Sequence, residues 1–252
     1  RQMCIRDSIY IGHIPGIGTD ALAGIGVTSA VIILISSFSA IVGAGGSPLA
    51  AIALGQGNRE RAGQILGNGF ILLLIFTILT SATTYLFMEP ILLFTGASEN
   101  TIGYATDYLS IYLLGTLFVE LSVGLNTFIN TQGRPTIAMY SVLIGAILNI
   151  GLDPLFIFTF GMGVKGAALA TILSQACSAI WVISFLTSKK ASLRLEYRYM
   201  KLHKGIILSI LALGVSPFIM ASTESLVGFV LNSSLEKFGD IYVLSLIHIS
   251  EP

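Results

Sequence analysis

The chain alternates between long apolar runs and short polar connections. Apolar stretches of more than about 18 residues recur at roughly 25–52, 63–87, 104–130, 136–160, 166–187 and 205–234. As an α-helix, each is long enough to cross a hydrocarbon core of about 30 Å. The pattern therefore predicts six complete membrane-spanning helices, most of them long enough to tilt or to extend beyond the bilayer.

The two ends of the chain interrupt this pattern. Residues 9–12, "IYIG", are interpreted as the last turn of an earlier helix whose start is absent. "RQMCIRDS" at 1–8 and "LSLIHISEP" at 244–252 are interpreted as translated sequencing-adapter sequence, and both are excluded from reasoning about the fold. The remaining chain is expected to be an interior part of a longer protein.

The composition agrees with a membrane protein. Hydrophobic residues make up 54% and charged residues 10% of the chain, and the mean hydropathy is +0.86, whereas soluble domains carry roughly a quarter charged residues. Cys4 lies in an excluded tract and Cys177 in an apolar run, so no disulfide or metal site is indicated. The histidines lie outside the predicted helix centres, which argues against an intramembrane site built from His13, His203 and His248.

Positive charge falls mostly on one side of the predicted helices. The loop around 55–62, the turn at 133–135 and the connection 188–204 together hold nine Lys and Arg residues, against Lys165 and Lys237 on the other side. This bias places the connection 188–204 in the cytoplasm, and the missing N-terminus with it, in a plasma (inner) membrane. The connection is read as a solvated linker that touches anionic headgroups. As the longest polar stretch, it also predicts a boundary between a bundle at 9–187 and a second one beginning at 205–243.

Three acids lie inside predicted spans, where each costs about 2.5–3.5 kcal/mol on insertion scales. Glu120 lies near the middle of its helix and either hydrogen-bonds a neighbouring helix or lines a cavity. Glu224 lies in "MASTESLVGF", where the adjacent hydroxyl residues favour a polar cavity. Tyr140 is a further candidate for a cavity wall, although the sequence does not say which way it faces.

Asp153 carries the strongest signal of the three. It lies in "LNIGLDPLF" at 148–156, with Asn149 four residues earlier on the same helix face and Pro154 directly after. Pro154 donates no backbone hydrogen bond, which either bends the helix or leaves a carbonyl oxygen for an ion or water. A carboxylate balanced between burial and a nearby cation can exchange H⁺ for another cation. The alternative is a buried acid that a neighbouring hydroxyl satisfies and that serves helix packing.

The glycine-rich stretch "VGAGGSP" at 42–48 is not a phosphate loop, because it lies inside an apolar span with no preceding strand and no Lys-Ser/Thr ending. Close packing of helices explains it better.

Several of these segments together resemble a known family. They are "VTSAVIILISSFSAIVGAGGSPLAAIALGQGN", "GLNTFINTQGRPTIAM", "LNIGLDPLFIFTFGMGVKGAALATILSQ" and "LGVSPFIMASTESL". Over about residues 9–240 the chain resembles the N-terminal half of a multidrug and toxic compound extrusion (MATE) transporter. The resemblance implies an all-α polytopic membrane protein: a six-helix N-lobe with its first helix truncated, then the first helix of the C-lobe of a twelve-helix transporter.

The resemblance also implies a cation-coupling site. In the family, an Asn and an Asp one turn apart on helix five and a Thr on helix six bind the cation, and Asn149, Asp153 and Thr171 match them. An acid before Gly-His on helix one matches Asp7. An acid on helix seven that some members use for Na⁺ matches Glu224.

The expected function is a secondary-active antiporter that exports amphipathic, cationic organic compounds in exchange for Na⁺ or H⁺. It is expected not to be an enzyme, to need no cofactor and no metal beyond Na⁺ at Asp153 or Glu224, and to act as a monomer when full length. Its expected partners are membrane lipids and small organic substrates, not nucleic acid. One alternative is a lipid-linked sugar flippase of the same superfamily, which would carry more cationic residues at mid-span. Another is a membrane-embedded enzyme, which would need clustered acids for Mg²⁺ or a nucleophile beside a base.

Overall fold

The computed structural model describes residues 10–12 and 18–236, and in this part of the chain the six predicted spans are six membrane-length helices. They are α2 (Gly18–Gly55), α3 (Arg59–Leu86), α5 (Ile102–Thr131), α6 (Pro135–Pro154, continued as the π-helical η1, Leu155–Thr159), α7 (Gly163–Thr187) and α8 (Lys204–Glu236). Residues 10–12 are also helical. The prediction of an all-α membrane protein is confirmed.

Two short elements were not predicted. Helix α4 (Met88–Phe94) follows α3, and the 3₁₀ turn η2 (Tyr197–Tyr199) lies within the connection between α7 and α8. The turn between α5 and α6 is tight: Gly133 has a φ of 74°, which favours glycine, and Pro135 occupies the first turn of α6. This turn makes α5 and α6 antiparallel neighbours.

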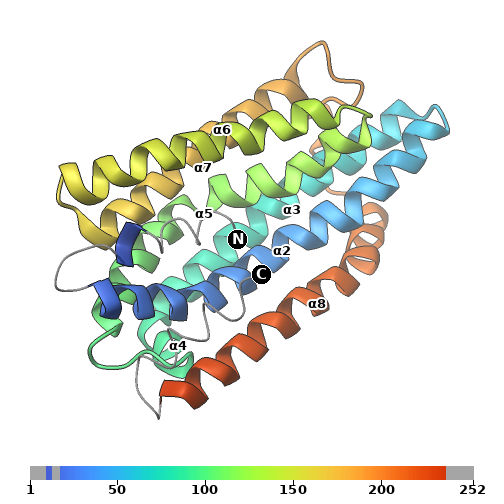
Figure 1. Ribbon diagram of the computed structural model, residues 1–252. Coiled ribbons are helices and arrows are strands. Elements are labelled where there is room, and N and C mark those ends of the chain that lie inside the picture. The colour runs from blue at the N-terminus through green and yellow to red at the C-terminus, as the bar shows by residue number, and fades with distance from the viewer. Residues whose placement is uncertain (1–9, 13–17, 237–252) are drawn as a thin grey trace.

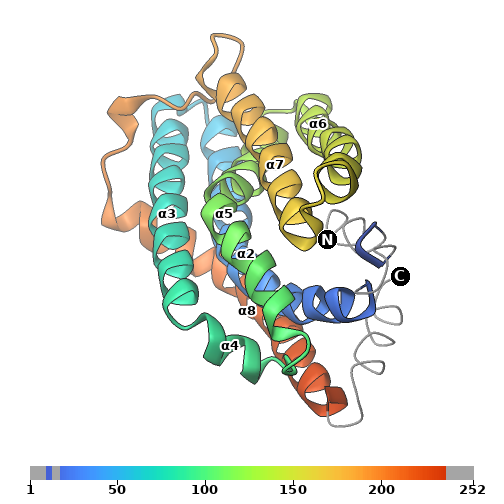
Figure 2. The same ribbon diagram turned by 90° about the vertical axis from the view of Figure 1, so that its left-hand side faces the viewer.

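The long helices form a bundle with α2 near its centre. Helix α2 packs against α3, α5 and α8, while α7 lies between α5 and α6. Figures 1 and 2 show α6 and α8 on opposite margins of the bundle. The most hydrophobic 18-residue window of α2 is 61% buried, but that of α8 is only 11% buried. Helix α8 thus touches the rest of the chain along one narrow side.

Glycines allow α2 and α8 to cross closely. A Cβ on Gly45 would collide with the backbone carbonyl of Ile210 on α8, and a Cβ on Gly214 would collide with the carbonyl of Ile41 on α2. A Cβ on Gly46 would come within 2.7 Å of the Phe128 ring on α5. The interpretation of "VGAGGSP" as a helix-packing segment is therefore confirmed.

The connection 188–204 is held against the bundle rather than solvated along its length. Leu193 is buried in the core, and its backbone N–H donates to the side-chain oxygen of Gln132 at 3.0 Å. The Asn68 side chain on α3 is fully buried and accepts from the backbone N–H of His203 at 2.8 Å. The prediction of a solvated linker is wrong for this backbone, because the side-chain amides of Asn68 and Gln132 and the buried side chain of Leu193 anchor it.

Candidate functional site

Helix α6 turns its polar side inward. Its buried residues recur every three or four positions and are small or polar: Ala138, Ser141, Gly145, Asn149 and Asp153. Its large apolar side chains lie on the exposed sides, for example Val142, Ile147 and Ile150. In a bilayer the lipid accepts these apolar side chains, so small and polar residues remain for the contact with a neighbouring helix.

That neighbour is α7, which runs antiparallel to α6. Three side-chain hydrogen bonds join the two helices at regular intervals, between Asn149 and Thr171, Ser178 and the carbonyl of Ser141, and Trp181 and the carbonyl of Ile137. As the residue number falls along α6 it rises by a similar amount along α7. This constant register brings Thr171 opposite Asn149.

The predicted convergence of three polar side chains is confirmed. The Asn149 side-chain amide donates to an oxygen of Asp153 at 3.0 Å and to the hydroxyl of Thr171 at 3.3 Å. Asn149 and Asp153 are fully buried and Thr171 is 4% exposed. A carboxylate, an amide and a hydroxyl from two helices therefore meet at one site enclosed in the protein.

The backbone changes directly after Asp153. Helix α6 ends at Pro154 and continues as the π-helical turn η1, a change of helix type that the sequence did not predict. The first turn of α7 packs tightly on η1, where a Cβ on Gly166 would come within 2.8 Å of the carbonyl of Phe156. Asp153 thus lies where the α-helix changes to a π-helical turn. Such turns within α-helices are frequent at functional sites.

The side chains of the site are suited to a small hard cation or a proton. All three can offer oxygen atoms, and carboxylate and amide oxygens are the preferred ligands of hard cations. In the described part of the chain, no group of three or more His, Cys, Asp or Glu residues is placed to hold a metal ion.

Glu120 lies elsewhere in the bundle. It is 2% exposed on α5, where its carboxyl group lies beside Ser36 and Ser39 of α2. Neither carboxylate oxygen makes a well-aligned hydrogen bond. The structure places it between α2 and α5, apart from the contact of α6 with α7 that holds Asp153.

Glu224 was expected to lie in a polar cavity. It is exposed on α8, whereas the adjacent Ser225 is buried and donates to the carbonyl of Ala30 on α2 at 2.7 Å. Tyr140 is 47% exposed and lies edge-on to the Trp181 ring, and thirteen residues of helix separate it from Asp153 by roughly 20 Å. Asp7 lies outside the described residues.

Two tyrosines that the sequence reasoning missed lie near the site. Tyr108 and Tyr112 on α5 are buried, and their rings stack with centroids 6.2 Å apart. They share an apolar cluster with Ala167 and Ala168, which lie one turn before Thr171 on α7. Tyrosines at 104, 108 and 112 recur every four residues, a helical spacing that could have indicated a hydroxyl-bearing face.

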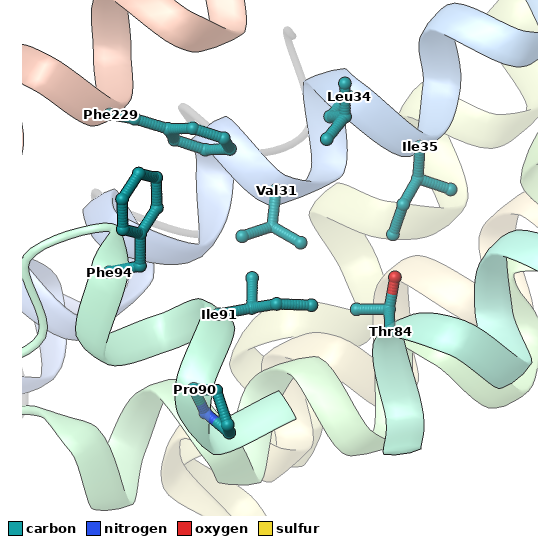
Figure 3. A pocket seen from close by; sticks show the side chains of 8 residues that line it. All are labelled: Val31, Leu34, Ile35, Thr84, Pro90, Ile91, Phe94 and Phe229. Atoms are coloured by element: carbon teal, nitrogen blue, oxygen red, sulfur yellow. The ribbon is translucent and has the colours of Figure 1, made fainter. Parts of the chain in front are cut away.

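A separate apolar cavity lies between α2, α4 and α8 (Figure 3). It has a volume of about 260 Å³, and the rings of Phe94 and Phe229 meet edge to face at one end with centroids 6.3 Å apart. Thr84 supplies the one polar side chain of its lining, and the others are Val31, Leu34, Ile35, Pro90, Ile91, Phe94 and Phe229. No acid lines this cavity, so it is distinct from the site at Asp153.

The bundle of membrane-length helices with a buried polar site is that of a polytopic membrane protein. The MatE family model matches residues 3–155, and the chain belongs to this family. The chain is 28% identical over 241 residues to the multidrug export protein MepA of Staphylococcus haemolyticus, covering 96% of this chain and 53% of that protein. It is 32% identical over 183 residues to MepA of Staphylococcus saprophyticus, covering 73% of this chain and 38% of that protein.

Solved structures of the family share the fold. An inward-facing multidrug resistance MATE family transporter of the MOP superfamily superimposes with a TM-score of 0.89 at 26% identity, over 96% of this chain and 55% of that one. A MATE protein in the bent conformation gives a TM-score of 0.85 at 26% identity, over 98% of this chain and 55% of that one. The chain spans about half the length of the relatives it matches.

Proposed function

We propose that this chain forms one lobe of a secondary-active antiporter that exports amphipathic, cationic organic compounds in exchange for Na⁺ or H⁺. The single observation that carries the proposal is the buried cluster of Asp153, Asn149 and Thr171. Burial of an acid within a membrane-spanning helix is costly, so such acids usually serve a function. Support also comes from the curated relatives, which are named multidrug export proteins.

The geometry gives each residue a role in cation exchange. Asp153 supplies the negative charge that binds H⁺ or Na⁺, and Thr171 supplies a neutral oxygen from the facing helix. The Asn149 amide now donates one hydrogen to each of them. Rotation of this amide by about 180° would turn its oxygen toward the same spot, so the side chain could act as a donor in the cation-free state and as a ligand in the cation-bound state.

Coupling then follows from two states with different affinities. An ion that binds at the contact of α6 with α7 must favour one arrangement of the lobe, and the exported compound must favour the other. Inverted repeats that rock around a midplane site would convert this difference into transport. We also propose that the whole protein lies in the plasma (inner) membrane as a monomer, with the connection 188–204 and the N-terminus in the cytoplasm.

The test is ion-driven efflux by the intact transporter. Purified protein in proteoliposomes is expected to move ethidium against its gradient when a Na⁺ or a proton gradient is imposed. Ethidium should be transported without chemical conversion. Each gradient is imposed alone, so the assay also assigns the coupling ion. Transport that is unaffected by collapse of both gradients would contradict the proposal.

A further inference from the structure

A second pocket lies at the end of the bundle where α3 begins and α7 ends. It has a volume of about 380 Å³ between the first turn of α3 and the docked connection 188–204. Gly63 and Tyr199 meet within its lining, where a Cβ on Gly63 would lie 2.7 Å from the Tyr199 ring. The orange connection lies beside the upper end of α3 in Figure 2. The pocket is therefore built from two segments far apart in the sequence.

The pocket is strongly cationic. Four of its lining residues are basic and one is acidic: Arg59, Lys189, Arg194, Arg198 and Glu196. The carboxylate of Glu196 forms an ion pair with Arg198 at 2.7 Å, so it compensates that charge. Among the described residues, Arg59 and Lys189 make no ion pair. Arg194 makes no ion pair with a described residue either, so three cations remain uncompensated at one opening, and the positive end of the α3 dipole adds to them.

Two features of the pocket favour a phosphate group. Arg194 donates through its Nε to the carbonyl of Ser188 at 3.0 Å, which holds its guanidinium group in place. Arg198 stacks over the Tyr199 ring at 4.5 Å, which holds a second one. Fixed guanidinium groups present parallel N–H donors, and this is the geometry that binds phosphate oxygens best.

The position of the pocket favours a lipid over a soluble anion. Helices α3 and α7 both have the length and composition of membrane spans, so their ends lie at the level of the headgroups. Clusters of Lys and Arg at this level attract anionic lipids by about 1 kcal/mol per side chain.

We propose that this pocket binds the phosphate group of an anionic phospholipid. Bound there, the lipid bridges the start of α3 and the connection that leads into α8. It thereby stabilises the docked form of the connection, which is already anchored at Asn68 and Gln132.

The test compares two pairs of charge-neutralising variants in the intact protein. Arg59→Gln with Lys189→Gln removes two of the three uncompensated cations of the pocket. Arg61→Gln with Lys190→Gln removes two exposed cations that lie one or two residues away in sequence but do not line the pocket. Native mass spectrometry then measures retention of phosphatidylglycerol, of phosphatidylcholine with the same acyl chains, and of inorganic phosphate.

Phosphatidylglycerol should bind the unmodified protein in preference to phosphatidylcholine. The pocket pair should lose about tenfold or more in affinity, and the control pair less than about twofold. Equal losses in the two pairs would mean general attraction to a basic surface and would overturn the proposal. So would equal retention of the two lipids, or displacement of phosphatidylglycerol by inorganic phosphate at a similar concentration. If the pocket pair expresses poorly, Lys189→Gln alone must still weaken binding more than Lys190→Gln alone.

Discussion

Replacement of Asp153 by asparagine tests the proposed cation site most directly. The two side chains have nearly the same size, and the oxygen of the new amide could still accept the hydrogen bond that the Asn149 amide now donates at 3.0 Å. The change therefore removes the titratable charge and leaves the packing of α6 on α7. Because a neutral amide is cheaper to bury than an acid, the variant should insert and fold at least as well as the parent protein.

The expected loss can be estimated from the geometry. A cation at the position of the Asn149 amide nitrogen, which is 3.0 Å from the Asp153 oxygen, would lie about 4 Å from the carboxylate carbon. At an effective dielectric constant of about 20, two unit charges at this distance attract each other by about 4 kcal/mol. Loss of that attraction lowers cation affinity by about a thousandfold, since each 1.4 kcal/mol is about tenfold. Transport coupled to the ion should fall to the background at physiological ion concentrations.

The measurement is gradient-driven accumulation of ethidium in inside-out vesicles at matched expression. Asp107→Asn is the matched control, because it makes the same chemical change at an exposed acid whose partner is Lys165 at 3.2 Å. Exposed ion pairs contribute about 1 kcal/mol or less, so this control should transport at close to the parent rate. Near-normal coupled transport by Asp153→Asn would refute the reasoning. The acid would then serve packing, and coupling would have to be sought at Glu120 or Glu224.

Two further substitutions separate the site from the surrounding helix contacts. Thr171→Val keeps the shape of the side chain but removes the hydroxyl that Asn149 contacts, so the half-saturating ion concentration should rise about fivefold. Ser178→Ala removes another hydrogen bond between the same helices and should leave that concentration unchanged. An equal shift in both variants would argue against a role of Thr171 as a ligand. Gly45→Leu places a side chain against the backbone of α8 and should lower the Tm in detergent by about 5 °C or more. Gly151→Ala, which meets open space, should leave the Tm unchanged or raise it, and equal Tm values for the two would contradict the close crossing.

Much of the architecture could be predicted from the sequence. The six spans follow from the length of the apolar runs, because a bilayer selects helices by hydrophobic length. The polar pair at Asn149 and Asp153 follows from the four-residue spacing, which places both side chains on one side of a helix whatever surrounds it. The tight turn at Gly133 follows from a local backbone requirement.

The tertiary structure alone decided which side of each helix is covered. Helices α2 and α8 are both long and apolar, yet their most hydrophobic windows are 61% and 11% buried. Lipid is as apolar as a protein core, so hydrophobic periodicity cannot distinguish the two environments. For the same reason the sequence did not show that Glu224 is exposed on α8 while Ser225 beside it faces α2.

The docking of the connection 188–204 also depended on the whole fold. Its many basic residues indicate a solvated segment, but Leu193 is buried and the amides of Asn68 and Gln132 bind its backbone. Those two partners lie more than 60 residues earlier in the chain, so they could not be predicted from the local composition of the connection. Composition and spacing thus determined the membrane spans and the polar pair of the site. Packing between distant segments determined the anchored connection, the glycine contacts and the enclosure of Asp153, because these depend on which backbones meet.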